Sequence, residues 1–231
     1  MELWLVDRHT DDLKVALRVQ RTLFRRQSAY QLVEVVETAG FGRALLLDGV
    51  LQITEAEEFC YHEMLVHVPL GFHPRPERVL IVGGGDAGAL REVLKHEEVR
   101  EVDLVEIDQV VIEATRECFP RLAAAFDHPK VRLHVADGAQ FIRERRDAYD
   151  VILVDSTDPG GPSLPLFTEE FYGRCREALR PEGVLSAQSD SPLFTAEVVR
   201  QTYRRLRAVG FPSVEGYVSD APFYALGPWA F

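Results

Sequence analysis

Glycines and a carboxylate that could bind a charged nucleoside lie together between Val79 and Gly88. Gly83, Gly85 and Gly88 satisfy G-x-G-x-x-G after an apolar run, which is the strand–turn–helix that binds nucleotide-like ligands in open α/β sheets. Asp86 is the unusual member, because a carboxylate there would repel a pyrophosphate and attract a cation. The loop therefore argues against NAD as the ligand and favours a positively charged nucleoside such as a sulfonium. The alternative is that Asp86 only caps the following helix.

Further acidic residues follow the other predicted strands, and these are Glu106, Asp108, Asp137, Asp155, Asp158 and Asp190. If the strands are parallel, all these carboxylates ring one crevice at the carboxyl ends of the strands. Asp155, Asp158 and Asp86 would repel one another unless a cation lay among them. No His/Cys cluster accompanies them, so an organic polycation fits better than a metal ion. A hard-metal site of oxygen ligands stays open as the alternative.

Two of these acids stand where a nucleoside would need acceptors. Glu106 follows Gly88 by about the spacing of the ribose-binding acid in nucleotide folds, and its two oxygens could take both ribose hydroxyls. Asp137 could accept from an exocyclic adenine amino group, or it could merely form an Asp-Gly turn with Gly138.

The elements that must position these residues alternate after Pro76. The predicted strands are Arg78–Gly83, Glu101–Ile107, Val131–Ala136, Asp150–Asp155 and Gly183–Ala187. The predicted helices are Ala87–His96, Gln109–Phe119, Ala139–Arg145, Thr168–Leu179 and Thr195–Ala208. The strands are nearly continuous apolar runs, as expected when helices cover both faces of a parallel sheet. We therefore expect an α/β fold with a doubly wound, Rossmann-like sheet of the methyltransferase type.

The first part of the chain has a different pattern of apolar and polar residues. Loose alternation over 13–26 and 30–37, and a hairpin over 44–53 with Asp48-Gly49 at its turn, predict a small antiparallel β unit. An amphipathic run follows, and Thr54 to Glu57 is typical of a helix capping box. His73-Pro74-Arg75-Pro76 then marks a boundary. We expect an N-terminal β domain with a linking helix over residues 1–73 and a catalytic domain over 74–231.

Composition narrows the class of protein. The 231 residues carry a net charge of −11, which disfavours nucleic acid and anionic membranes as partners. No apolar run is long enough to span a bilayer, and the first residues lack the features of a signal peptide. Three scattered cysteines (Cys60, Cys118 and Cys175) argue against a zinc site and for a reducing compartment, so we expect a cytoplasmic protein.

Several motifs together resemble the spermidine synthases, the polyamine aminopropyltransferases. They are Gly83–Gly88 with Leu90–His96, Val105–Asp108, Asp155–Pro159 with Gly161-Pro162, Leu166–Tyr172, Asp48–Glu55 and Glu58–Leu65. The likeness runs in order from about Trp4 to the C-terminus. It implies aminopropyl transfer from decarboxylated S-adenosylmethionine to a diamine, with release of methylthioadenosine. It also implies no cofactor and no metal, and a homodimer or homotetramer assembled partly through the N-terminal β unit.

The resemblance also implies roles for individual residues. Asp155, helped by Tyr61, would be the catalytic base. The donor would be bound by Gln31, Gly83, Gly85, Asp86, Glu106, Asp137 and Gly138, with Asp86 holding the aminopropyl ammonium. The amine substrate would be bound by Gln52, His62, Asp158 and Tyr224.

This sequence departs from the family pattern at a few positions. Ala87 stands where glycine is usual, and its methyl group would be tolerated if the backbone φ is negative. The loop after Asp158 differs at Gly160 and Ser163, and we expect it to be a mobile lid over the amine. Asp190 stands where Glu is common, and the chain ends at Phe231 where family members usually continue through a last strand.

Putrescine is the expected acceptor, and the changes leave agmatine or a longer polyamine as alternatives. A methyltransferase that uses S-adenosylmethionine on the same fold is a further alternative. Asp86 argues against it, because that donor's own carboxylate would meet the acid. A non-enzymatic binding homologue would need no base at Asp155.

Overall fold

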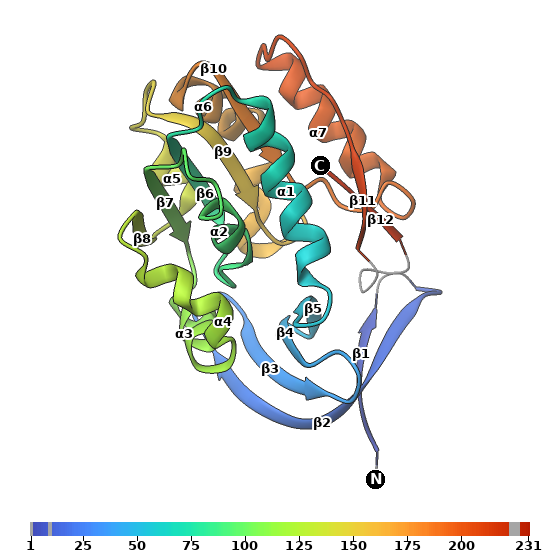
Figure 1. Ribbon diagram of the computed structural model, residues 1–231. Helices are drawn as coiled ribbons and strands as arrows, with labels where there is room; N and C mark the ends of the chain where they lie inside the picture. Colours follow the sequence, from blue (N-terminus) through green and yellow to red (C-terminus); the bar gives the residue numbers. More distant parts are fainter. Residues whose placement is uncertain (1, 9–10, 222–226) are drawn as a thin grey trace.

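The computed structural model describes residues 2–8, 11–221 and 227–231 of the chain, and two sheets dominate it (Figure 1). The N-terminal sheet is antiparallel throughout, in the order β1 (Leu3–Arg8), β2 (Lys14–Gln27), β3 (Leu32–Thr38), β4 (Arg43–Leu47) and β5 (Val50–Thr54). Asp48 and Gly49 join β4 to β5 with φ values of +50° and +82°, which a tight hairpin turn requires. The predicted hairpin is confirmed.

Helix α1 (Glu58–Phe72) links the two sheets. The predicted capping box is wrong, because Thr54 is the last residue of β5 and the helix begins one turn later. Its N-cap residue is Glu57, whose side chain makes no capping hydrogen bond. The tight connection from β5 fixes where the helix starts, and this tertiary constraint overrides the local sequence signal.

The second sheet is parallel, in the order β10 (Leu179–Ala187), β9 (Tyr149–Asp155), β6 (Arg78–Gly83), β7 (Glu101–Glu106) and β8 (Val131–Val135). The chain starts in the middle at β6, runs outward to β8, and then crosses back to β9 and β10. Strands β6 and β9 are thus neighbours at the point where the order reverses, and ligands of such folds bind outside the strand ends at that point. The predicted doubly wound fold is confirmed.

Helices cover both faces of this sheet, because alternate strand residues point to opposite sides. Val79, Ile81 and Leu104 pack in one apolar cluster with α1, with α2 (Gly88–Val93) and with α3 (Gln109–Cys118). Leu80 and Val82 point the other way, into a second cluster with α5 (Gly138–Ile142) and α6 (Glu169–Ala178). The remaining elements are α4 (Pro120–Ala123), η1 (Ala124–Asp127), η2 (Gly161–Phe167), α7 (Ala196–Ala208), β11 (Val218–Ala221) and β12 (Gly227–Ala230).

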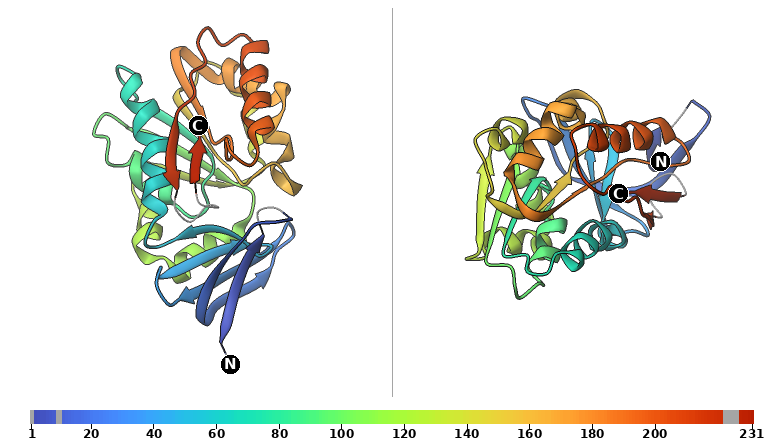
Figure 2. Two further views of the ribbon diagram at one scale, coloured as in Figure 1. Left: turned by 90° about the vertical axis from the view of Figure 1, so that its right-hand side faces the viewer. Right: turned by 90° about the horizontal axis from the view of Figure 1, so that it is seen from above.

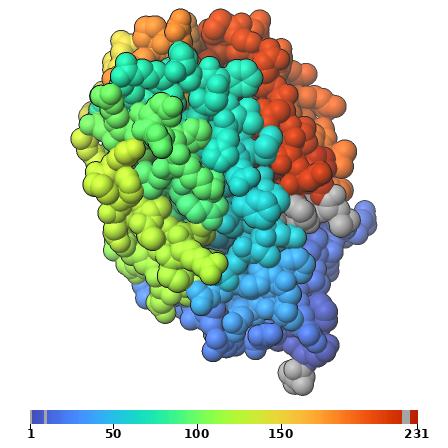
Figure 3. All heavy atoms as spheres, in the orientation of Figure 1, coloured from blue at the N-terminus to red at the C-terminus, as the bar shows by residue number. Residues whose placement is uncertain are grey.

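The N-terminal sheet lies beneath the parallel sheet as a separate layer (Figure 2, left). On the face drawn in Figure 3 it adjoins α1 and the region of α3 and α4, and β2 and β3 contact α3. Arg26 of β2 pairs with Glu113 of α3, and the guanidinium of Arg43 donates to the carbonyl of Cys118. At the other end of the chain, Ala230 of β12 exchanges backbone hydrogen bonds with Ser189 and Asp190, just after β10.

In the described part of the chain, no helix is long and apolar enough to cross a membrane.

Candidate active site

A cavity opens at the carboxyl ends of β6, β7, β8 and β9, and the N-terminal sheet and α1 close its other side. It holds about 890 Å³ of atom-free space, part of which is open to solvent. The structure brings these sequence-predicted residues to its wall: Gln31, Gln52, Tyr61, His62, Gly83, Gly85, Asp86, Glu106, Asp137, Gly138 and Asp155. A second cavity adjoins it and shares Gln52 and Tyr61, and this one contains Asp158. Tyr224 lies outside the described residues.

The glycine loop brings the cavity wall into close contact with β9. Gly83 has φ +86°, and a Cβ there would lie 2.0 Å from the carbonyl oxygen of Asp155, so only glycine fits. The amide of Gly84 donates to that same carbonyl at 2.9 Å, which locks the loop to the catalytic strand. Ala87 has φ +66°, so the condition set for tolerating its methyl group is not met. The left-handed conformation costs a non-glycine residue about 1 kcal/mol.

Asp155 faces the cavity from the last position of β9. Its Oδ1 accepts a hydrogen bond from the Tyr61 hydroxyl at 2.8 Å. Its Oδ2 is buried and has no hydrogen-bond partner among the described residues. Burial and the nearby charge of Asp86 raise the pKa of Asp155 to about 6, although His62 and Tyr61 act in the opposite direction. Asp155 is therefore a stronger base than an ordinary carboxylate and still ionised at neutral pH.

Asp86 and His62 form a second pair of side chains on the cavity wall. The Oδ1 of Asp86 accepts from the amide of Gly88 at 2.6 Å, so the residue does hold the start of α2. The same oxygen lies 3.5 Å from Nε2 of His62, and the Asp86 side chain keeps 14% of its surface exposed. The capping role and a ligand-binding role are thus compatible at this position.

Glu106 and Gln31 lie where a ribose would be expected. Glu106 accepts backbone hydrogen bonds from Gly85 at 3.1 Å and from Asp108 at 2.8 Å. Burial, the main cause, raises the pKa of Glu106 to about 7 despite these donors. The amide group of Gln31 donates to Asp108 Oδ2 at 3.1 Å. Asp137 caps α5 by accepting from the amide of Ala139 at 2.8 Å, and it also reaches the cavity wall.

One expectation about the ring of acids is wrong. Asp108 lines neither cavity, because its carboxylate turns away and is buried. It accepts from the hydroxyl of Ser28 at 2.6 Å and from the amide of Val110, where it caps α3. Ser28, between β2 and β3, and Val110, in α3, supply these hydrogen bonds, and a strand-end position alone could not show the contact with Ser28.

The second cavity is acidic. Asp158 is exposed at its mouth, and Asp190 and Asp7 lie in its wall. Although part of the residue is exposed, desolvation of its carboxylate by the surrounding protein raises the pKa of Asp158 to about 7. The negative charges of Asp190 and Asp7 add to this. Ser163 of η2 ties the adjacent loop down, because its hydroxyl donates to the carbonyl of Asp158 at 2.6 Å. The arrangement would attract a second positive charge beside the first cavity.

Two groups of side chains in the described chain are close enough to share a cation. Ligand atoms of His62, Asp86 and Asp155 lie within 4.8 Å of one another, and so do those of Glu63, His67 and Glu92. The second group lies outside both cavities, and the ammonium of Lys95 already reaches Glu92 Oε2 at 2.5 Å. The first group lies in the wall of the first cavity.

Sequence reasoning missed some residues around the cavities. Glu58 and Arg91 support His62 from behind, and only the packing of α1 on α2 brings them together. Asp7 belongs to β1, a strand that was not predicted. The sequence did carry a signal for each of these features. Glu58 and Arg91 fall inside motifs that carried the resemblance, and residues 3–6 of β1 are a run of apolar residues.

Comparison with known proteins gives a consistent result. The family model described as spermine/spermidine synthase domain matches residues 58–231, and the spermidine synthase tetramerisation domain matches residues 3–55. The chain is 45% identical over its full length to a polyamine aminopropyltransferase of Bacillus cytotoxicus, of which it covers 84%. It is 41% identical to one of Caldicellulosiruptor saccharolyticus, of which it covers 83%.

Solved structures agree with this. A spermidine synthase in complex with the transition-state analogue AdoDATO superposes with a TM-score of 0.96 at 40% identity, covering 99% of this chain and 78% of that one. Spermidine synthase from Thermotoga maritima gives a TM-score of 0.92 at 38% identity, covering 99% of this chain and 77% of the other.

Proposed function

The chain belongs to the spermine/spermidine synthase family and is a polyamine aminopropyltransferase, and on this premise we propose that it makes spermidine from putrescine. The aminopropyl donor would be decarboxylated S-adenosylmethionine, and methylthioadenosine would be the second product. The observation that carries the proposal is the set of carboxylates on one cavity wall beside the glycine loop, namely Asp86, Glu106, Asp137 and Asp155.

The donor is a cation at two places, the sulfonium and the terminal ammonium. We assign its ribose to Glu106 and Gln31, its adenine to Asp137 and Gly138, and its ammonium to Asp86. Gly83 and Gly85 leave room for the nucleoside to approach the backbone. In each case the donor offers the carboxylate a positive charge or a hydrogen-bond donor, which replaces the water molecules that the carboxylate loses on binding.

The acceptor amine must lose a proton before it can attack. An alkyl amine has a pKa near 10 and is protonated and inert at neutral pH. Asp155 would accept the proton on its unpartnered Oδ2, while Tyr61 holds Oδ1 in place. Asp158, with Gln52 and Tyr224, would hold the rest of the diamine. His62, which the resemblance assigns to the amine, lies in the wall of the first cavity beside Asp86, so we place it near the donor's ammonium.

The transfer itself is a direct displacement. The amine nitrogen forms a bond to the carbon beside sulfur, the C–S bond breaks, and its electron pair stays on sulfur as the neutral thioether. The cavity supplies the in-line placement of nitrogen, carbon and sulfur. Because a sulfonium is already a good leaving group, the proposal needs neither a metal nor a cofactor.

A product assay with a panel of amines tests the proposal. The protein is incubated with decarboxylated S-adenosylmethionine and putrescine, agmatine or spermidine, and products are identified by mass spectrometry. We expect spermidine and methylthioadenosine from putrescine at the highest rate. Faster turnover of agmatine or spermidine would reassign the acceptor, and no aminopropylated product with any amine would contradict the proposed reaction.

Assembly follows from the N-terminal sheet. Strand β1 lies at one edge of it and exposes Leu3, Trp4 and Val6, with about half of each residue's surface in contact with solvent. Apolar side chains on an edge strand favour burial against another copy. Together with the match to the tetramerisation domain, this supports a homodimer or homotetramer, and sedimentation analysis would determine the state.

A further inference from the structure

His62 is held between two carboxylates on the wall of the donor cavity. The residue has no exposed surface. Its Nδ1 lies 2.7 Å from Oε2 of Glu58, and its Nε2 lies 3.5 Å from Oδ1 of Asp86. A Cβ at Gly88 would come within 2.1 Å of the ring, so the imidazole packs directly on the backbone of α2. The ring therefore has a fixed position and a defined partner on each side.

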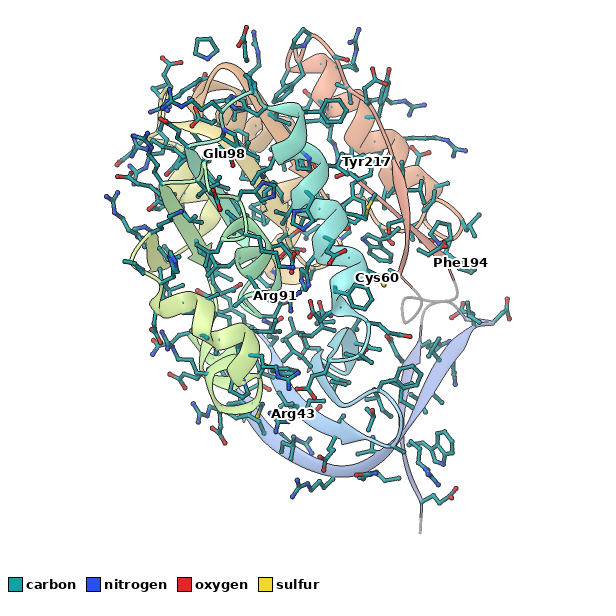
Figure 4. The ribbon with its side chains drawn as sticks, in the orientation of Figure 1. Arg43, Cys60, Arg91, Glu98, Phe194 and Tyr217 are labelled. Atoms are coloured by element: carbon teal, nitrogen blue, oxygen red, sulfur yellow. The ribbon has the colours of Figure 1, made fainter. Side chains whose placement is uncertain are left out.

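Arg91 acts on this ring through Glu58. The guanidinium of Arg91, a residue that Figure 4 labels beside α1, donates to both oxygens of Glu58. Its NH2 lies 3.0 Å from Oε2 and its NH1 lies 2.5 Å from Oε1. Burial alone would raise the pKa of Glu58, but the hydrogen bonds from His62 and Arg91 lower it below its ordinary value. An ionised Glu58 can only accept, so Nδ1 of His62 must donate to it.

The other ring nitrogen, Nε2, can then exist in two states. It is buried and has no hydrogen-bond partner among the described residues. If Nε2 carries a lone pair, it repels the oxygen of Asp86. If it carries a proton, the N–H is attracted to that oxygen. Burial opposes a charged ring, but Asp86, Glu58 and Asp155 outweigh it and raise the pKa of His62 well above its ordinary value. The groups that face the ring are Glu58 and Tyr61 of α1, Asp86 of the glycine loop, Arg91 of α2 and Asp155 of β9.

We propose that Arg91 and Glu58 are positioning residues that hold His62 as a proton-carrying partner of Asp86, and that the ring gives up its Nε2 proton when the donor's ammonium binds. The proposal rests on the proposed function, because it takes the ammonium to bind at Asp86. Two cations beside one carboxylate would repel, so the proton leaves to solvent. The neutral Nε2 can then accept a hydrogen bond from the ammonium, while Nδ1 stays bonded to Glu58.

This exchange has a measurable consequence. If binding releases a proton, the affinity for the donor must rise with pH, up to about tenfold per pH unit below the pKa of His62. Methylthioadenosine has the same nucleoside but no aminopropyl ammonium, so its affinity should not follow that rise. Glu106 faces the ribose of both ligands, so its titration cancels in the ratio of the two affinities. Asp155 does not cancel in this way, so the ratio is compared only at pH values well above 6, where Asp155 is already ionised.

Isothermal titration calorimetry in buffers of different ionisation enthalpy counts the protons released. For the wild-type protein we expect release with decarboxylated S-adenosylmethionine and none with methylthioadenosine. In Glu58→Gln the release should fall, because the ring loses one of the two carboxylates that favour its proton, while binding of methylthioadenosine persists and shows that the variant is folded. Glu92→Gln is the matched control. Glu92 is also buried and also bonded to Arg91, at 2.7 Å from its Nε, but it does not touch His62, so release should persist.

Three results would overturn the inference. The first is equal proton release with the two ligands in the wild-type protein. The second is a ratio of affinities that does not change with pH. The third is unchanged release in Glu58→Gln. If Glu58→Gln does not fold, the pH dependence of the wild-type ratio decides alone. A protein that forms spermidine without releasing a proton on donor binding disproves only this inference, whereas a protein that forms no aminopropylated product disproves the proposed function.

Discussion

Replacing Asp155 by asparagine should stop catalysis and leave the nucleoside site intact. The amide keeps the shape of the carboxylate, and its oxygen can still accept from Tyr61 at the Oδ1 position. At the Oδ2 position, however, an NH2 donor would face the amine in place of the acceptor that must take its proton. Loss of a general base costs about two to four orders of magnitude in rate. We expect the upper part of that range, because the replacement atom also repels the amine's N–H.

The pH dependence sharpens this prediction. Asp155 acts as a base only when ionised, and its pKa is about 6, so wild-type kcat should fall below about pH 6 and rise to a plateau above it. In Asp155→Asn the rise of kcat near pH 6 should be absent. The residual rate should instead climb with pH towards the amine's own pKa near 10, because solvent then removes the proton.

Stopped-time product assays with both substrates saturating would measure kcat, and calorimetry with methylthioadenosine would check the nucleoside site. Asp147→Asn is the matched control. It makes the same chemical change at an exposed residue beyond the opposite end of β9, and asparagine tolerates the φ of +44° found there. An Asp155→Asn variant with wild-type kcat, or with the wild-type step near pH 6, would refute the assignment of the base.

Three further predictions concern the glycine loop and the amine loop. Asp86→Asn keeps the acceptor for the amide of Gly88 but loses its charge. The binding free energy of decarboxylated S-adenosylmethionine should therefore weaken by about 1.5–3 kcal/mol, and the difference in affinity between it and S-adenosylmethionine should narrow. If calorimetry finds the ratio of these two affinities unchanged, Asp86 is only a helix cap. Gly88→Ala places a methyl group against the ring of His62 and should lower the free energy of unfolding in urea by about 1–3 kcal/mol and weaken donor binding. Gly173→Ala in α6, where the added Cβ comes no closer than 3.9 Å to its neighbours, is its control and should not destabilise the protein. Amides over residues 158–168 should exchange hydrogen more slowly when donor and amine are bound, and equal exchange in both states would mean that this loop does not cover the site.

The parallel sheet could be predicted from the sequence because local signals agreed with the tertiary structure. Apolar runs such as 79–82 end in glycines or acids, and each is followed by a helical pattern, so strand, loop and helix were assigned together. The strand-end position then placed Asp86, Glu106, Asp137 and Asp155 at one crevice, and the structure brings them to one cavity.

The remaining features depend on contacts between distant parts of the chain. Strand β1 has no turn chemistry to announce it and exists through its pairing with β2. The start of α1 is fixed by the connection from β5, and Asp108 turns away from the cavity because Ser28 and Gln31 reach it. The contact of Arg91 with Glu58 joins residues 33 positions apart, and no local pattern reveals it.

A competition between the two sulfonium donors tests the central claim most directly. The protein is given putrescine with equal concentrations of decarboxylated S-adenosylmethionine and S-adenosylmethionine, each carrying a different isotope label in its transferable group. We predict that the label of the aminopropyl group appears in spermidine and that methylthioadenosine accumulates in equal amount. Label from the methyl group in the amine product, or no transfer of either label, would contradict the account.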